Sequence, residues 1–364
     1  MTLLDSEDER PPIDWPPGFG QDQPPEEGRR SWQRVDLTDV LSGRYTPPAP
    51  AVGARSDGVG LFYPGRLHTI ASESEGGKTW FALYAARCEL DAGNAVVYLD
   101  FEDDEGGIVG RLLALGTDRE SIRDRFAYVK PEESVAAFGN REDLAAILDQ
   151  LHPAVVFLDG VTEAMAMHNL EMKDNTDIAV FGALLPRWIA NRGPATVALD
   201  HVVKDRENRG RYAIGGVHKL NGLNGAAYVL ENRTPFTIGG TGRSTVYISK
   251  DRPGQLRRHA LPGREKLSWF GDLVIKSHNE AFVEVDLTPP VDKPEDFRPT
   301  VLMGRIAAAL AEHGPLSQRR LMAAAKGNSG SKRDALELLI LDGYVSEKTP
   351  HELLKPYLDG GDSQ

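Results

Sequence analysis

The segment SESEGGKT, residues 72–79, constrains the fold of this chain more than any other. It lies between an apolar run at 66–71, which predicts a strand, and residues 78–93, whose apolar spacing predicts a helix ending at Gly93. A glycine-rich turn in this position points backbone N–H groups into one concavity, where the helix dipole favours an anion. The pattern predicts a phosphate-binding loop, and a chance Gly-Lys-Thr turn is the competing explanation.

The residue types of this loop suit ATP and Mg²⁺. Gly76 and Gly77 allow the backbone to approach phosphates, Lys78 can reach the β- and γ-phosphates, and the Thr79 hydroxyl can ligate Mg²⁺. Ser72 departs from the usual pattern, which opens with glycine. The residues expected to contact the nucleotide are Ser72, Glu73, Ser74, Glu75, Gly76, Gly77, Lys78, Thr79 and Trp80.

Strands and helices alternate beyond the loop, which predicts right-handed crossovers and a mostly parallel sheet covered on both faces. The predicted strands are 95–101, 154–159 and 195–201, and the predicted helices are 142–151 and 181–193. After Ala226 the pattern changes to strands alone, which indicates an antiparallel extension of the sheet. These strands are expected at 226–232, 244–250, 255–261, 267–271, 273–277 and 281–287.

The chain is expected to have four parts. Residues 1–64 form an acidic, proline-rich tail that is largely disordered, because such a segment buries too little apolar surface to offset its ordering entropy. Residues 65–287 form the α/β domain, and residues 288–299, with four prolines, form a linker. Residues 300–364 show three short helices and a strand-like end, which predicts a small winged helix-turn-helix domain.

Composition excludes several classes of protein. Cys88 is the only cysteine, so an internal disulfide and a cysteine-clustered zinc site are ruled out. The N-terminus lacks the basic start and apolar run of a secretory signal, and no apolar stretch reaches the length of a membrane helix. We therefore expect a cytoplasmic protein with no membrane partner.

Carboxylates follow two of the buried strands. Asp159 ends the strand at 154–159, where a carboxylate would lie beside the phosphate loop and hold magnesium. Glu102 follows the strand at 95–101 and is the candidate base that orients or deprotonates the attacking water. Asp100 is expected to stabilise the strand end, while Asp103 and Asp104 are expected to cap the next helix.

Three further side chains could meet a triphosphate. His201 ends the strand at 195–201, where it can touch a γ-phosphate; a satisfied structural histidine is the alternative. Lys250 and Arg252 lie two apart on an extended segment, and therefore on one side of it. They suit a triphosphate, including that of a neighbouring subunit, or else form a solvated pair at a hairpin.

These motifs, in this order, resemble those of RecA-fold ATPases, and most closely the RepA-type and DnaB-like hexameric helicases of phages and mobile elements. The resemblance covers roughly residues 60–262. It implies that Lys78 and Thr79 bind ATP and Mg²⁺, that Glu102 is the catalytic base and that Asp159 is the second magnesium residue. It further implies His201 as a γ-phosphate sensor and Lys250 and Arg252 as fingers across a subunit interface. Such helicases usually have a second histidine where this chain has Asp200.

The net charge of −12 does not indicate nucleic-acid binding, but residues 305–333 hold six Lys or Arg against one acid. In the RecA fold, the loop matching residues 204–222 contacts single-stranded DNA. The cationic residues predicted to bind DNA are Lys204, Arg206, Arg209, Arg211 and Lys219 in this loop, and Lys332 and Arg333 in the C-terminal domain.

The sequence thus predicts Mg²⁺-dependent ATP hydrolysis coupled to single-stranded DNA, in a ring-forming helicase that is a homo-hexamer. The N-terminal tail is a candidate contact for replication proteins. Two alternatives stay open: a RecA- or RadA-like recombination or repair ATPase that forms filaments, and a nucleotide-gated winged-helix DNA-binding regulator.

Overall fold

The structure, a computed structural model, describes residues 34–201, 222–263, 267–291, 300–326 and 329–357. The chain divides into two units, Met1–Pro290 and Val291–Gln364, each with a hydrophobic core of its own. Among the helices that the structure describes, none combines the length and the apolar character that a membrane span requires.

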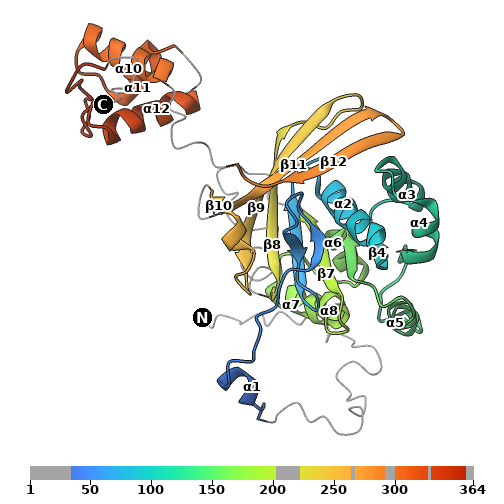
Figure 1. The fold of residues 1–364 in the computed structure, drawn as a ribbon. Helices are drawn as coiled ribbons and strands as arrows, with labels where there is room; N and C mark the ends of the chain where they lie inside the picture. The colour runs from blue at the N-terminus through green and yellow to red at the C-terminus, as the bar shows by residue number, and fades with distance from the viewer. Residues whose placement is uncertain (1–33, 202–221, 264–266, 292–299, 327–328, 358–364) are drawn as a thin grey trace, which may run out of the picture. The chain divides into compact units, whose positions relative to one another are not determined.

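One mixed sheet organises the first unit; its described residues form ten strands in the order β10-β11-β9-β8-β3-β7-β6-β4-β5, with β12 paired to β11 (Figure 1). The parallel strands are β3 (Leu67–Ser72), β4 (Val96–Asp100), β5 (Phe126–Val129), β6 (Val155–Asp159), β7 (Ala195–His201) and β8 (Ala226–Thr234). The antiparallel strands are β9 (Thr241–Asp251), β10 (Leu261–Pro262), β11 (Ser268–Asn279) and β12 (Phe282–Thr288).

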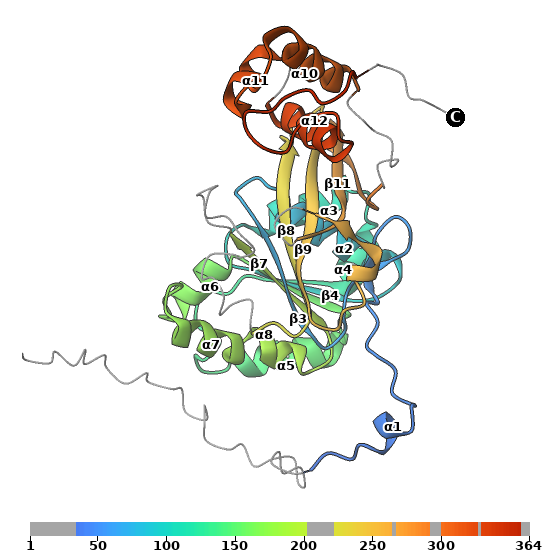
Figure 2. The ribbon, with the colours of Figure 1, turned by 90° about the vertical axis from the view of Figure 1, so that its left-hand side faces the viewer.

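Helices cover both faces of the parallel strands, because their residues are apolar on both faces. One face packs against α2 (Lys78–Asp91), α3 (Glu105–Ala114) and α4 (Arg119–Arg125). The other packs against α5 (Asn140–Leu151), α6 (Val161–Met167), α7 (Asn175–Leu184) and α8 (Pro186–Ala190), which Figure 2 shows gathered on one side of the sheet. The expected α/β class, with a large, mostly parallel sheet flanked by helices, is confirmed.

Several local predictions need correction. Strand β8 is parallel to β3, so the antiparallel extension begins only at β9. The two predicted strands at 267–271 and 273–277 are one strand, β11, while 255–261 holds a short 3₁₀-helix, Arg257–His259. The predicted helix at 181–193 is divided, because Pro186 lacks an N–H and starts a new helix, α8. The edge strand β5 and helix α4 were not predicted.

The boundary predicted at residue 64 is also wrong. The hairpin of β1 (Val52–Ala54) and β2 (Gly60–Phe62) belongs to the folded domain, and Leu61, Phe62 and Tyr63 are completely buried. Their short apolar run is masked in the sequence by the prolines and acids around it. Upstream, α1 (Thr38–Leu41) has no buried residue.

The His68 ring holds this hairpin against the sheet. It stacks on Tyr63, packs edge-on against Phe62, and accepts a hydrogen bond from the backbone N–H of Ala226. Complete burial lowers the pKa of His68 to about 4, so the ring is neutral at physiological pH.

The second unit consists of α10 (Thr300–His313), α11 (Gln318–Ala324) and α12 (Ser329–Leu341) around a small apolar core. Beyond α12, the described residues form only isolated antiparallel bridges, Leu316 with His351 and Val345 with Leu353. The three predicted helices are thus present, and the winged helix-turn-helix assignment stays a prediction. The predicted linker, 288–299, lies mostly outside the described residues.

The corrected boundary predicts that two substitutions by alanine, one on each side of it, change the free energy of unfolding by different amounts. Phe62→Ala should lower the free energy of unfolding by about 3–5 kcal/mol, because it empties a buried aromatic site. Val35→Ala, at a side chain 78% exposed, should change it by less than about 0.5 kcal/mol. Urea unfolding followed by circular dichroism measures both free energies. Equally small effects of the two substitutions would contradict the assignment of the hairpin to the folded domain.

Candidate nucleotide-binding site

The loop between β3 and α2 has the backbone that anion binding requires. Gly77, the N-cap of α2, has φ +93°, and Glu75 has φ +60°. A Cβ at Gly76 would lie 2.7 Å from that of Ser72, so this position has no room for a side chain. The tight turn brings the backbone N–H groups at the start of α2 to one place.

Ser72 does not disturb the loop. It is the last residue of β3, is fully buried and does not have a positive φ, so its backbone needs no glycine. Its hydroxyl donates to the Glu73 carbonyl at 2.7 Å. Ser74 and Glu75 are exposed, and Trp80 packs partly buried against the core.

The parallel register gathers polar residues at the carboxyl edge of the sheet. Ser72 lies opposite His201, and Asp159 lies opposite Asp100. The loop therefore shares this edge with residues that come from three other strands of the sheet, as expected for such a topology.

Lys78 is the centre of the resulting cluster. Its Nζ lies 3.0 Å from His201 Nε2, 3.5 Å from Glu102 Oε1 and 3.9 Å from Asp159 Oδ1. His201 Nε2 also lies 3.5 Å from Glu102 Oε1. The five residues predicted to carry the chemistry within one chain, these four and Thr79, are thus in mutual reach.

Asp159 and Thr79 fit a magnesium ion. Thr79 Oγ1 donates to Asp159 Oδ2 at 3.2 Å, while the buried Oδ1 has no hydrogen-bond partner among the described residues. Burial raises the pKa of Asp159. A hydroxyl beside an unsatisfied carboxylate oxygen suits a hard cation that takes its remaining ligands from phosphates and water. No group of three or more His, Cys, Asp or Glu in the described residues could hold a metal by itself.

Tyr98 and Gly160 support these carboxylates and were not predicted. The buried Tyr98 hydroxyl donates to Asp159 Oδ2 at 2.6 Å. Gly160, with φ +88°, leaves space for Glu102, since a Cβ there would come within 2.7 Å of Glu102 Cγ. Two sequence signals could have indicated them: Tyr98 is a polar residue inside an apolar predicted strand, and Gly160 directly follows the strand-end Asp159.

The other acids near Glu102 have structural contacts. Asp100 Oδ1 accepts from the N–H groups of Glu102 and Asp103, and its Oδ2 accepts from the Tyr128 hydroxyl. Asp104 is the N-cap of α3, whereas Asp103 pairs with Arg111 at 2.9 Å. Asp100 therefore fixes the turn that carries Glu102.

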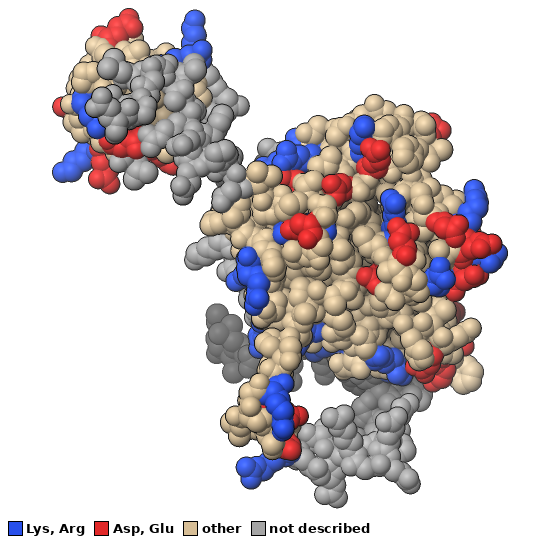
Figure 3. Space-filling model, viewed as in Figure 1, with Lys and Arg blue, Asp and Glu red and all other residues tan. Residues whose placement is uncertain are grey.

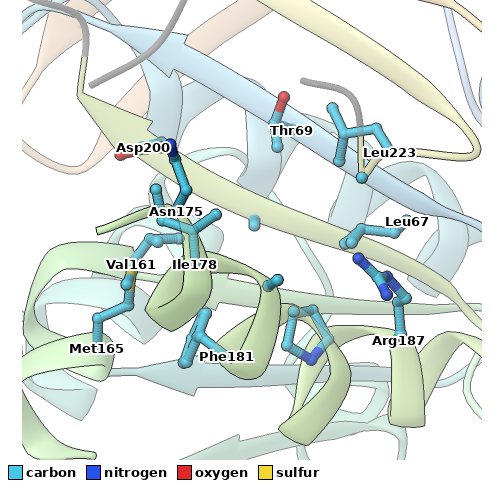
Figure 4. A pocket seen from close by; sticks show the side chains of 15 residues that line it. Leu67, Thr69, Val161, Met165, Asn175, Ile178, Phe181, Arg187, Asp200 and Leu223 are labelled. Carbon is cyan, nitrogen blue, oxygen red and sulfur yellow. The ribbon is translucent and has the colours of Figure 1, made fainter. Parts of the chain in front are cut away.

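Asp200 faces away from this cluster. It lines a cavity of about 240 Å³ on the opposite face of the sheet, together with Thr69, Asn175, Ile178 and others (Figure 4). Neighbouring residues of a strand point to opposite faces, so His201 can meet Lys78 while Asp200 cannot. Asp200 is therefore not part of the cluster around Lys78.

Lys250 and Arg252 lie away from the phosphate loop of their own chain. Lys250, on β9, pairs with Ala227, which is level with Thr69 on β3. Thr69 precedes Ser72 by three residues, about 10 Å along a strand, and Arg252 lies further toward the amino end of β3. Burial and the charge of Arg252 lower the pKa of Lys250.

The predicted DNA-contacting residues differ in whether the structure describes them and in how exposed they are. Lys204, Arg206, Arg209, Arg211 and Lys219 lie outside the described residues. The prediction for Lys332 is wrong, because its ammonium is buried and donates to the carbonyls of Met322 and Ala325 at the end of α11. Arg333 is exposed. On the face of the first unit seen in Figure 3, Lys and Arg are interspersed with Asp and Glu and form no continuous basic surface.

Comparison with known proteins gives one family match and one similar structure. Residues 33–207, just under half of the chain, match the protein family described as AAA domain. A KaiC-like protein from the hyperthermophilic archaeon Pyrococcus horikoshii OT3 aligns with 14% identity over 65% of this chain and 98% of its own, with a TM-score of 0.45. No curated protein has a detectably similar sequence.

Tyr98→Phe tests the magnesium assignment. Losing a hydrogen bond to an ionised, buried carboxylate raises the pKa of Asp159 further and should raise the half-saturating Mg²⁺ concentration for ATP hydrolysis about tenfold or more. The defect should grow as the pH falls, because protonation of Asp159 competes with the cation. Tyr128→Phe is the matched control, since that hydroxyl donates to Asp100 instead. Equal Mg²⁺ requirements in both variants would contradict the assignment.

The phosphate loop, the strand-end carboxylate and the match of residues 33–207 to the AAA domain family together support a P-loop ATPase-like domain in this chain.

Proposed function

We propose that the protein hydrolyses ATP with Mg²⁺ at the carboxyl edge of its sheet, in an oligomer whose turnover is coupled to DNA. The observation that carries the proposal is the cluster around Lys78: Glu102 in the turn after β4, Asp159 at the end of β6 and His201 at the end of β7 all lie within 4 Å of its ammonium group. A charged cluster that only stabilised the fold would need no phosphate loop beside it. A P-loop ATPase uses the phosphate loop and the charged cluster together.

The roles follow from the contacts. Lys78 and the Mg²⁺ held by Thr79 and Asp159 neutralise charge on the transferred phosphoryl group. Glu102, whose turn Asp100 and Gly160 position, orients the attacking water. His201, in contact with both Lys78 and Glu102, meets the γ-phosphate and connects its loss to the segment that follows β7.

Lys250 and Arg252 complete the site of a neighbouring subunit. They lie too far along the sheet to serve their own phosphate loop, yet two cations directed to one side suit a triphosphate. Hydrolysis would then require a homo-oligomer, and a closed ring of six is the arrangement that the helicase resemblance implies.

DNA coupling is supported by the helicase resemblance and by the cations at the helix starts of the C-terminal unit. Arg319 and Arg320 are exposed in the first turn of α11, and Arg333 is exposed at the fifth residue of α12. A replicative helicase of a phage or mobile element is the function that unites the ATPase site, an oligomer and a DNA-contacting unit.

A combined ATPase and strand-displacement assay tests this function. The wild-type protein should hydrolyse ATP only with Mg²⁺, faster with single-stranded DNA, and should displace a strand from a forked duplex. Glu102→Gln should bind ATP and lose hydrolysis by roughly two to four orders of magnitude, while Asp104→Asn, at a helix cap, should keep it. ATPase activity without stimulation by DNA and without unwinding would support the proposed ATPase activity and contradict the proposed helicase function. Near wild-type turnover in Lys78→Ala would contradict both.

Mixing two inactive variants tests the shared site. Arg252→Ala should bind ATP yet hydrolyse it poorly, because the planar guanidinium that contacts two oxygens of a neighbour's phosphate is lost. When it is mixed with Lys78→Ala, activity should return at interfaces where Lys78 of an Arg252→Ala subunit faces Arg252 of a Lys78→Ala subunit. Phosphate release from equal mixtures measures this, and no recovery despite confirmed co-assembly excludes a finger acting between subunits.

A further inference from the structure

The β8–β9 hairpin holds the phosphate loop from the side opposite to the catalytic cluster. The buried Ser244 hydroxyl, on β9, donates to the Gly76 carbonyl at 2.9 Å across a separation of 168 residues. Asn232 of β8 lies 3.5 Å from the same hydroxyl and donates to it, which leaves the hydroxyl hydrogen for Gly76. The bond is therefore directed from the hairpin to the loop.

Ser244 stands where the strand pattern favours an apolar side chain. Val246 and Ile248 follow it on the same face of β9 and are buried in the main core. A hydroxyl at the first position of this row is the one polar group of the three, and it lies where the strand passes the phosphate loop. Burying it is tolerable because it is hydrogen-bonded.

The hairpin also packs on the next residue of the loop. A Cβ at Gly77 would lie 2.9 Å from the Phe236 ring and 3.3 Å from a methyl carbon of Leu273 on β11. The ring in turn requires Gly242, where a Cβ would come within 2.2 Å of it. Gly76 and Gly77 are thus held by one hydrogen bond from β9 and by one aromatic contact from the loop between β8 and β9.

The bonded carbonyl and the N–H of Gly77 belong to one planar peptide group. In a trans peptide these two groups point to opposite sides, so fixing the carbonyl of Gly76 also fixes the direction of the Gly77 N–H. This N–H opens α2, where unpaired backbone donors meet an anion. A loop that must otherwise order itself on binding would lose affinity to that ordering.

We infer that Ser244 and Phe236 are positioning residues that set the phosphate-binding conformation of the loop, and so determine its affinity for nucleotide. The inference rests on the proposed nucleotide binding. It assigns the antiparallel strands a second task besides carrying Lys250 and Arg252: they shape the phosphate loop of their own subunit.

Two matched pairs of variants test it. Ser244→Ala and Ser249→Ala each remove a buried β9 hydroxyl that donates to a backbone carbonyl, of Gly76 and of Ala227 respectively. Phe236→Ala and Ile238→Ala each shorten an apolar side chain in the same hairpin loop, and Ile238 is 74% exposed. Binding of a fluorescent ATP analogue with Mg²⁺, ATPase kinetics, and thermal unfolding without nucleotide are measured for all four.

Ser244→Ala should weaken analogue binding and raise the KM for ATP about five- to tenfold, with kcat within about twofold, since it removes binding common to substrate and transition state. Phe236→Ala should weaken binding in the same sense, and Ser249→Ala and Ile238→Ala should bind as the wild type does. A purely structural role predicts that affinity follows thermal stability in every variant.

The outcomes separate the two proposals. Wild-type affinity in both Ser244→Ala and Phe236→Ala overturns the inference and leaves nucleotide binding intact. If Ser244→Ala fails to fold, the Phe236 and Ile238 pair decides, and equal affinity in that pair overturns the inference. Absence of binding in the wild type and in every variant overturns the proposed function and this inference with it.

Discussion

The buried ammonium of Lys78 is the charge on which the site depends. Only 7% of the residue is exposed, and a charge so placed is tolerable only where opposite charges and hydrogen-bonding groups surround it. Glu102 and Asp159 supply the charges, and the His201 imidazole supplies the closest contact. Asp159 and His201 end separate strands and Glu102 lies in the turn after a third, so the cluster forms only after the sheet has formed.

The sheet delivers the partners through its register. Parallel pairing aligns the ends of β3 and β7 and the ends of β4 and β6, which brings four polar residues to one edge without any long loop. A second layer of contacts then refines the arrangement: Tyr98 fixes Asp159, and Asp100 fixes the turn of Glu102. Gly160 provides the space that Glu102 occupies. Each supporting group is buried or half-buried, so its position is set by packing as well as by its hydrogen bond.

Strand β9 connects two regions for which we propose separate roles. Near the start of β9, Ser244 meets the phosphate loop; at its end, Lys250 lies at the level of the beginning of β3. A single strand thus extends from the nucleotide site of its own subunit toward the cations proposed to serve another. Under the proposal, Lys250, which follows Lys78 by 172 positions, would act at the nucleotide of a neighbouring subunit and not at that of its own chain.

The phosphate loop, the alternation of strands and helices, and the strand-end residues Asp159 and His201 were predictable, because each depends on local spacing and on the edge that parallel strands share. The sequence also indicated Glu102 over its acidic neighbours. It could not show that Lys332 is buried or that Leu61 to Tyr63 belong to the core, since these depend on what packs nearby.

The sequence by itself determined the fold class and the residues that converge on Lys78, because periodicity and motif spacing are properties of neighbouring positions. Tertiary structure alone decided which groups hold those residues in place. Tyr98 touches Asp159 across 61 positions, and Ser244 touches Gly76 across 168. Contacts of such separation leave no period in the sequence; they arise from strand order and register, which the packing of the whole domain selects.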